Sequence, residues 1–140
     1  MFVTAWEGNI DLKTGFVHFA NAGHNPPIIM RKDGTCEYVK GKAGFVLAGM
    51  EGARYREYEL ELKAGDCLFV YTDGVAEATD LSNTLYGTDR MIAALNSAKN
   101  SSCRQLLESL HQDMNAFVGE ADQFDDITML CFEYKKKMNA

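Results

Sequence analysis

The chain has 140 residues, 46% of them hydrophobic, and a formal net charge of −6. This length is enough for one buried core, so a single compact unit is expected. The negative charge argues against nucleic-acid binding, which requires a basic face, and no apolar run reaches the ~18 residues of a membrane-spanning helix. The first residues also lack the basic and apolar pattern of a signal peptide, so we expect a cytoplasmic protein with no membrane insertion.

Residues 1 to 62 have the pattern of short strands joined by turns. A polar break ending at Gly15 separates two of them and predicts a hairpin. Pro26 and Pro27 cannot donate backbone hydrogen bonds, so residues 22–25 are expected to form a loop. The predicted strands cover residues 2–10, 16–21, 28–30, 35–39 and 55–62.

The next run, residues 67–71, is apolar without interruption and lies between two turns, which predicts a strand covered on both faces. The period then becomes helical, first after a predicted N-cap at Thr88 and again after Ser102 and Gln105, which stand in capping-box positions. A last strand is predicted over residues 127–134. Hairpin strands followed by grouped helices indicate an α+β fold.

Two aspartates stand next to predicted strands. Asp73 directly follows the apolar strand, and Asp125 precedes the last one together with Asp126. If these strands are antiparallel neighbours, the end of one and the start of the other share an edge. Close carboxylates repel unless a cation or proton neutralises them, and Mg²⁺ or Mn²⁺ prefers such oxygen ligands. The same residues also suit an ordinary turn and an ordinary strand flank, so both interpretations stay open.

The remaining titratable residues give weaker patterns. His24 lies in the loop before the two prolines, where a ring nitrogen bonded to a backbone carbonyl would brace the loop. His18 and His111 are expected at the surface or its boundary without a partner. The cysteines contain no C-x-x-C pair, so neither a zinc clip nor a redox motif is predicted, and they are interpreted as buried, reduced thiols: Cys36, Cys67, Cys103 and Cys131.

Several motifs taken together resemble one family, the bacterial SpoIIE/RsbU branch of the metal-dependent serine/threonine phosphatases, whose fold is shared with eukaryotic type 2C enzymes. They occur in the family's order across nearly the whole chain. The motifs are F-V-T-A (2–5), D-L-K-T-G (11–15), N-A-G-H-N-P-P (21–27), G-D-C-L-F-V-Y-T-D-G-V-A-E-A (65–78), Y-G (86–87) and F-D-D-I-T (124–128).

The resemblance implies a fold and a chemistry. The fold would be an incomplete α-β-β-α sandwich with antiparallel sheets and two helices late in the chain. In the family, two Mn²⁺ or Mg²⁺ ions activate a bridging water that attacks phosphoserine or phosphothreonine. Asp73 and Asp125 match the metal ligands, and Asp126 matches a residue that orients its neighbour. Gly74 would let the backbone pass close to the ions.

Other positions are matched more loosely. Asn21, His24 and Asn25 lie where type 2C relatives carry a loop with a ligand for a third ion, and because His24 stands there no third ion is assigned. Glu77 resembles the start of the family's regulatory switch helix.

One departure from the family pattern lowers the activity expected of this chain. The family's upstream G-G-D-x-x-D and D-x-x-G-x-G segments, which carry further metal ligands, do not occur here. Residues 1–134 are therefore interpreted as the C-terminal portion of the phosphatase domain, with residues 135–140 as a basic, disordered tail. This portion is expected to bind ions weakly, to be inactive alone, and to form a homodimer through an exposed sheet edge.

The resemblance also suggests partners: a phosphorylated regulatory protein, such as an anti-sigma factor antagonist in partner-switching signalling, and an upstream sensor or regulatory domain. Two alternatives remain. The region could be a non-catalytic interaction module derived from the phosphatase fold, or another enzyme on a similar sandwich, which a parallel doubly wound sheet would favour.

Overall fold

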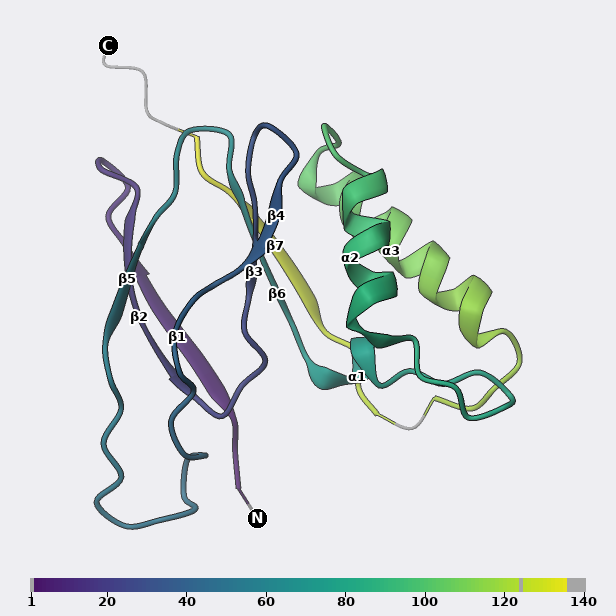
Figure 1. The fold of residues 1–140 in the computed structure, drawn as a ribbon, viewed down its shortest axis with the longest axis horizontal. Helices are drawn as coiled ribbons and strands as arrows, with labels where there is room; N and C mark the ends of the chain where they lie inside the picture. Colours follow the sequence, from purple (N-terminus) through teal and green to yellow (C-terminus); the bar gives the residue numbers. More distant parts are fainter. Residues whose placement is uncertain (1, 124, 136–140) are drawn as a thin grey trace.

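Two antiparallel sheets and a layer of helices make up the structure, a computed structural model that describes residues 2–123 and 125–135. One sheet has the strand order β1-β2-β5 and the other β4-β3-β6-β7 (Figure 1). The strands are β1 (Ala5–Ile10), β2 (Phe16–Ala22), β3 (Ile28–Met30), β4 (Cys36–Tyr38), β5 (Tyr58–Glu61), β6 (Cys67–Tyr71) and β7 (Met129–Glu133). The helices are α1 (Asp73–Ala76), α2 (Gly87–Ser97) and α3 (Cys103–Val118).

The layers follow the order sheet, sheet, helices. In Figure 1 the three-stranded sheet lies on one side, the four-stranded sheet in the middle, and α2 with α3 on the far side. This is the predicted α+β class, and its sheets are antiparallel, so the doubly wound alternative is wrong for the described residues. No helix within those residues combines the length and the apolar character needed to cross a bilayer.

The first hairpin forms as predicted. Asp11 and Gly15 close its turn, where the Gly15 amide donates to the Asp11 carbonyl over 2.7 Å. Gly15 has a φ of +83°, and a Cβ there would lie 2.2 Å from the Leu62 carbonyl oxygen, so only glycine fits. The turn sets the register that pairs Ile10 with Val17, and β5 then pairs with the other side of β2.

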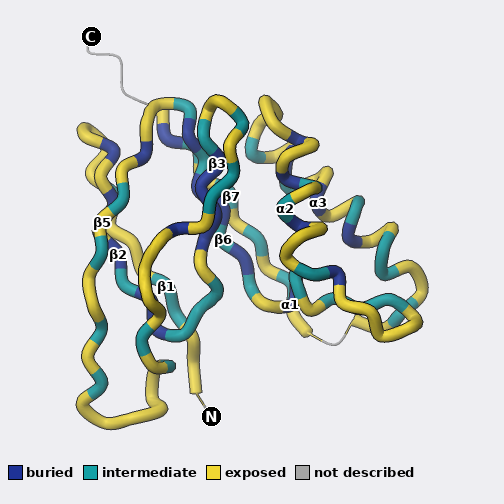
Figure 2. The backbone as a smooth tube through the Cα atoms, in the orientation of Figure 1, coloured by how far each residue is buried: buried dark blue, intermediate teal, exposed yellow. Residues whose placement is uncertain are grey.

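The strand β6 lies inside the four-stranded sheet, between β3 and β7. Leu68 faces the core between the two sheets, whereas Phe69 and Tyr71 face the core beneath the helices. All three residues are buried, and in Figure 2 buried positions lie along β6 in the middle of the molecule. The prediction of a strand covered on both faces is therefore confirmed.

The helical half matches the sequence prediction in part. Ser102 caps α3, and its side chain and that of Gln105 form the predicted capping box. The N-cap predicted at Thr88 is wrong, because α2 begins at Gly87 after Tyr86, which makes no side-chain cap. The Tyr86 hydroxyl instead donates to Asp113 over 2.7 Å and ties α2 to α3.

Four strands are shorter than predicted, among them β4, which covers Cys36–Tyr38 of the predicted residues 35–39. In the other three, residues beyond the strand ends make other contacts. Val3 forms an isolated bridge with Leu47, so β1 begins only at Ala5. The Tyr55 hydroxyl donates to the Val46 carbonyl, and β5 begins at Tyr58. The Thr128 amide donates to the side chain of Thr72, not to a ladder carbonyl, and β7 begins at the next residue.

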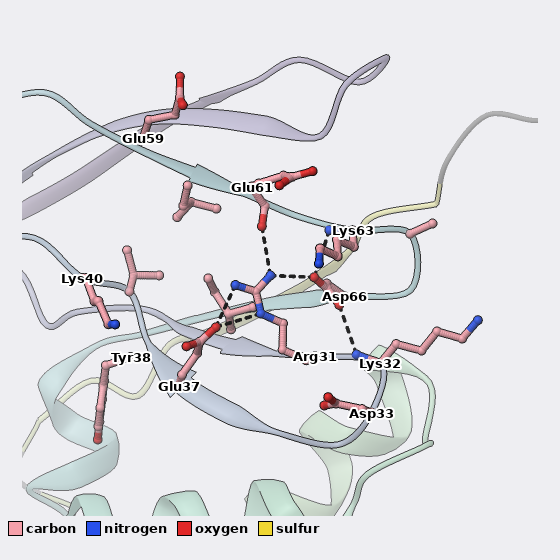
Figure 3. A pocket seen from close by; sticks show the side chains of 14 residues that line it. Arg31, Lys32, Asp33, Glu37, Tyr38, Lys40, Glu59, Glu61, Lys63 and Asp66 are labelled. Carbon is pink, nitrogen blue, oxygen red and sulfur yellow. Dashed lines mark hydrogen bonds and ion pairs between the residues drawn. The ribbon is translucent and has the colours of Figure 1, made fainter.

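A buried ion pair braces the two sheets against each other. Asp66, only 2% exposed, accepts hydrogen bonds from the Arg31 guanidinium (2.8 Å) and from the Lys63 amide (2.9 Å). The same guanidinium donates to the Glu61 carbonyl on β5 and pairs with Glu37 at 2.7 Å. Figure 3 shows this network along a hollow of about 760 Å³. Since its charged groups satisfy one another, we interpret it as structural.

The predicted tail falls almost wholly outside the described residues, which end at Lys135. The Lys135 ammonium lies 3.3 Å from the Glu133 carboxylate. His18, expected to have no partner, lies 3.5 Å from Glu57 and 3.4 Å from Glu59, because β2 pairs with β5. His111 lies 3.5 Å from the Asn115 side-chain amide, one helical turn away.

Candidate functional site

The two aspartate segments lie at the same edge of the four-stranded sheet. β6 and β7 are antiparallel neighbours, and their register pairs Tyr71 with Met129. Asp73 therefore lies two residues after the end of β6, at the edge where β7 begins three residues after Asp126. The strand arrangement on which the sequence argument depended is present.

Thr72 fastens the two segments together. Its amide donates to the Thr128 carbonyl over 3.0 Å, and its hydroxyl donates to the Asp126 carbonyl over 3.1 Å. The same hydroxyl accepts from the Thr128 amide at 3.0 Å. Three hydrogen bonds from one threonine thus hold the T-D-G segment against the D-D-I segment.

Gly74 explains how closely the segments approach. A Cβ built on Gly74 would lie 2.5 Å from the Asp126 carbonyl oxygen and 3.1 Å from its carbonyl carbon. The neighbour is backbone, so it cannot move aside as a flexible side chain could. Glycine is therefore required here because the backbones of the two segments touch each other.

Each carboxylate keeps a local backbone partner. One oxygen of Asp73 accepts from the Gly74 amide at 3.1 Å, and one oxygen of Asp125 accepts from the Asp126 amide at 2.7 Å. Among residues 2–123 and 125–135 neither forms an ion pair with a basic side chain. Each therefore retains an oxygen free to bind a cation.

Two hollows flank the segments and share one acidic residue. A hollow of about 300 Å³ is lined by Asn25, Asp73 and Glu77. A smaller one of about 100 Å³ is lined by Gly74, Glu77 and Asp125. Glu77, whose amide donates to the Asp73 carbonyl at 2.9 Å, closes α1 between them. Sequence reasoning gave Glu77 only a regulatory resemblance, because α1 is too short for a helical period to reveal.

The N-A-G-H-N loop is braced by a different group from the one predicted. The Asn21 side chain, buried at 7% exposure, accepts from the His24 amide (2.8 Å) and donates to the His24 carbonyl (2.9 Å). The His24 ring nitrogen lies 3.1 Å from the Thr4 hydroxyl. The prediction that the ring bonds a backbone carbonyl is therefore wrong, since Asn21 already satisfies the loop's backbone. This bracing leaves Asn25 at the hollow beside Asp73.

The oxygen donors suit a hard divalent cation but form an incomplete set. Carboxylates free of basic partners are the ligands that Mn²⁺ and Mg²⁺ prefer. In the part of the chain that the structure describes, however, the one group of three metal-ligating side chains within mutual reach consists of cysteines. Asp73 and Asp125 could thus supply part of a coordination sphere.

Comparison with known proteins decides the family. The family model for stage II sporulation protein E (SpoIIE) matches residues 1–135. The chain belongs to the SpoIIE family. Its antiparallel sandwich and its ordered motifs are those of the SpoIIE/RsbU-type phosphatase domains, which confirms the resemblance found in the sequence.

Individual relatives are longer than this SpoIIE-type chain. Protein IcfG from Synechocystis is 31% identical over 130 residues, which cover 93% of this chain and 20% of IcfG. The phosphoserine phosphatase RsbU from Bacillus subtilis is 24% identical, over 96% of this chain and 40% of RsbU. The SiaA-PP2C domain of Pseudomonas aeruginosa has a similar fold, with a TM-score of 0.80 and 22% identity over 94% of this chain and 52% of that domain.

Proposed function

We propose that residues 1–134 form the C-terminal portion of a metal-dependent phosphatase domain that hydrolyses phosphoserine or phosphothreonine in proteins. The observation that carries this proposal is the convergence of the Asp73 and Asp125 segments at one sheet edge, fastened by Thr72. Family membership gives the reaction class, and RsbU is itself a phosphoserine phosphatase.

The proposed roles follow from the contacts. Asp73 and Asp125 would each offer a carboxylate oxygen to Mn²⁺ or Mg²⁺, which supplies a water of lowered pKa and neutralises phosphate charge. Asp126 positions Asp125, because the backbone amide of Asp126 donates to the Asp125 carboxylate. Gly74 permits the close approach, and Asn21 holds the loop that carries His24 and Asn25. A structure of RsbX, which shares the fold with a TM-score of 0.60 over 91% of this chain, contains magnesium.

The chain alone is proposed to be inactive. A hard cation gives up its water reluctantly and needs several oxygen ligands, and two carboxylates leave most positions to solvent. The incomplete donor set is also the observation that favours a second candidate, a non-catalytic interaction module with structural carboxylates.

We further propose a cytoplasmic setting in which the substrate is a small phosphorylated regulatory protein, such as an anti-sigma factor antagonist. The likeness to RsbU supports this choice. The lengths of IcfG and RsbU support an additional sensor or regulatory domain in the complete protein.

Self-association through a sheet edge is also proposed. β7 is an edge strand of the four-stranded sheet, and Leu130 and Phe132, on the same sheet face as Leu68, are 60% and 37% exposed. Exposed apolar residues on an unpaired edge favour pairing with another strand.

The test uses this chain together with the longer protein that contains a complete set of acidic segments. We expect Mn²⁺-dependent hydrolysis of a phosphoserine peptide by the longer protein and none by the 140-residue chain. Asp73→Asn or Asp125→Asn should lower the rate at least about 100-fold. Glu108→Gln, on the exposed face of α3, is the matched control and should keep full activity. Unchanged activity in both aspartate variants would contradict these roles, whereas no activity in the longer protein would favour the interaction module.

A further inference from the structure

Three cysteines from three separate elements lie together beneath the helical layer. Cys67 begins β6, Cys131 lies in β7, and Cys103 begins α3. Their sulfur atoms all lie within 4.8 Å of one another. The sequence contains no C-x-x-C pair and gives no indication of this cluster, and the partial exposure of the three thiols corrects the expectation that they are buried. The spacing of the cysteines in the sequence could not reveal the cluster, because strand pairing and helix docking bring the three residues together.

The cluster is held by the fold itself. The β6–β7 register pairs Cys67 with Glu133 and Phe69 with Cys131, so both cysteines lie on the sheet face that packs against the helices. The capping box at Ser102 fixes the first turn of α3 and with it the position of Cys103. Ligands on paired strands and a capped helix lose little freedom on binding an ion.

The geometry suits a metal ion better than a disulfide between the two strand cysteines. Cys67 and Cys131 are diagonal neighbours, and diagonal Cα atoms lie about 7–8 Å apart in antiparallel pairs. Most disulfides need about 4.4–6.8 Å. A zinc ion with bonds of ~2.3 Å to sulfur places its ligands ~3.8 Å apart, so the sulfurs need to close by about 1 Å at most.

The surroundings suit a cation that binds thiolates. The carboxylates of Asp66 and Glu133 add negative charge near Cys67. A cleft of about 190 Å³, lined by Cys67, Glu133 and the fourth cysteine, Cys36, leads to the site from solvent. A fourth coordination position is thereby left for water.

We propose that Cys67, Cys103 and Cys131 form a three-thiolate site for Zn²⁺. The alternative, ordinary packing of three thiols, explains their partial burial but not the convergence of all three sulfurs. The site is separate from the aspartate edge, since β6 alone spans ~13 Å between Cys67 and Tyr71. It uses sulfur ligands, whereas the aspartate edge offers oxygen, and it is independent of the proposed phosphatase activity.

Cobalt(II) is the probe, because thiolate ligands give it a charge-transfer absorption that carboxylates do not. We expect the reduced, chelator-treated chain to bind one Co²⁺ with this absorption and to release it to Zn²⁺. Serine in place of Cys67, Cys103 or Cys131 should weaken binding at least about tenfold. Cys36→Ser is the matched control, since it removes a thiol of the same cleft that lies outside the cluster, and it should bind as the unaltered chain does.

A second measurement on the unaltered chain covers the case in which a serine variant does not fold. Zn²⁺ should protect three of the four cysteines from alkylation, and mass spectrometry should identify the reactive one as Cys36. Equal alkylation with and without Zn²⁺, or cobalt binding without the thiolate absorption, would overturn the proposal. Retention of the absorption in a folded Cys103→Ser variant would also contradict a three-thiolate site.

Discussion

The two ends of the β6–β7 pair present opposite chemistry. At the end where β6 finishes, Asp73 and Asp125 offer oxygen ligands. Towards the other end, Cys67 at the start of β6 and Cys131 in the middle of β7 offer sulfur, completed by Cys103 from α3. One antiparallel pair therefore brings together two sets of residues that are distant in sequence. The oxygen set is partial, whereas the sulfur set already has three members in mutual reach.

The largest expected effect is that a substitution at one end impairs the metal-dependent property of that end and leaves the property of the other end intact. Cys131→Ser should weaken cobalt–thiolate binding at least about tenfold while leaving Mn²⁺-dependent hydrolysis by the longer protein within about twofold. Asp125→Asn should do the reverse, because the two ends share strands but no ligand. Absorption titration and a phosphopeptide assay on both variants measure this. If either variant lost both properties while its thermal unfolding stayed unchanged, the two ends would not be independent.

Gly74→Ala should damage the oxygen end selectively. The added methyl would lie 2.5 Å from the Asp126 carbonyl oxygen, so the two segments must separate. We expect a loss of about 1–3 kcal/mol in the free energy of unfolding, measured by urea denaturation, and retained cobalt–thiolate absorption.

Gly41→Ala is the matched control for this substitution. Its nearest neighbours, at 3.2 and 3.3 Å, are ring atoms of Tyr58 and Phe19, which can shift. It should therefore cost less than Gly74→Ala. An equal loss in both variants would show that backbone contact at Asp126 is not the cause.

The smallest effect is expected at the exposed apolar residues of the edge strand β7. If the chain self-associates, Leu130→Lys should raise its dissociation constant about tenfold, equivalent to ~1.4 kcal/mol. Sedimentation equilibrium measures this, with Leu81→Lys as the control, since Leu81 is 74% exposed in a turn. A monomeric unaltered chain, or an equal effect from Leu81→Lys, would contradict association through β7.

Much of the fold could be predicted from the sequence, because local signals decide it. The apolar run of β6 and the Ser102 capping box each appear in a few neighbouring residues, and both are confirmed. The strand ends were less accurate, since Thr72 takes the Thr128 amide through its side chain, which no alternation reveals.

The candidate site could likewise be predicted from the sequence only in part. The T-D-G and D-D-I motifs could be found and expected at one edge, because antiparallel pairing alone brings their segments together. Glu77 was missed as a site residue because α1 has only one turn. The three thiols were missed because their meeting depends on the β6–β7 register and on the docking of α3.

The position of bound manganese tests the central claim most directly. Crystals of the longer protein soaked in Mn²⁺ can locate the ion by its anomalous scattering. Coordination by carboxylate oxygens of both Asp73 and Asp125 is the result predicted. Manganese bound elsewhere, with neither aspartate in contact, would contradict the assignment of this sheet edge as the metal site.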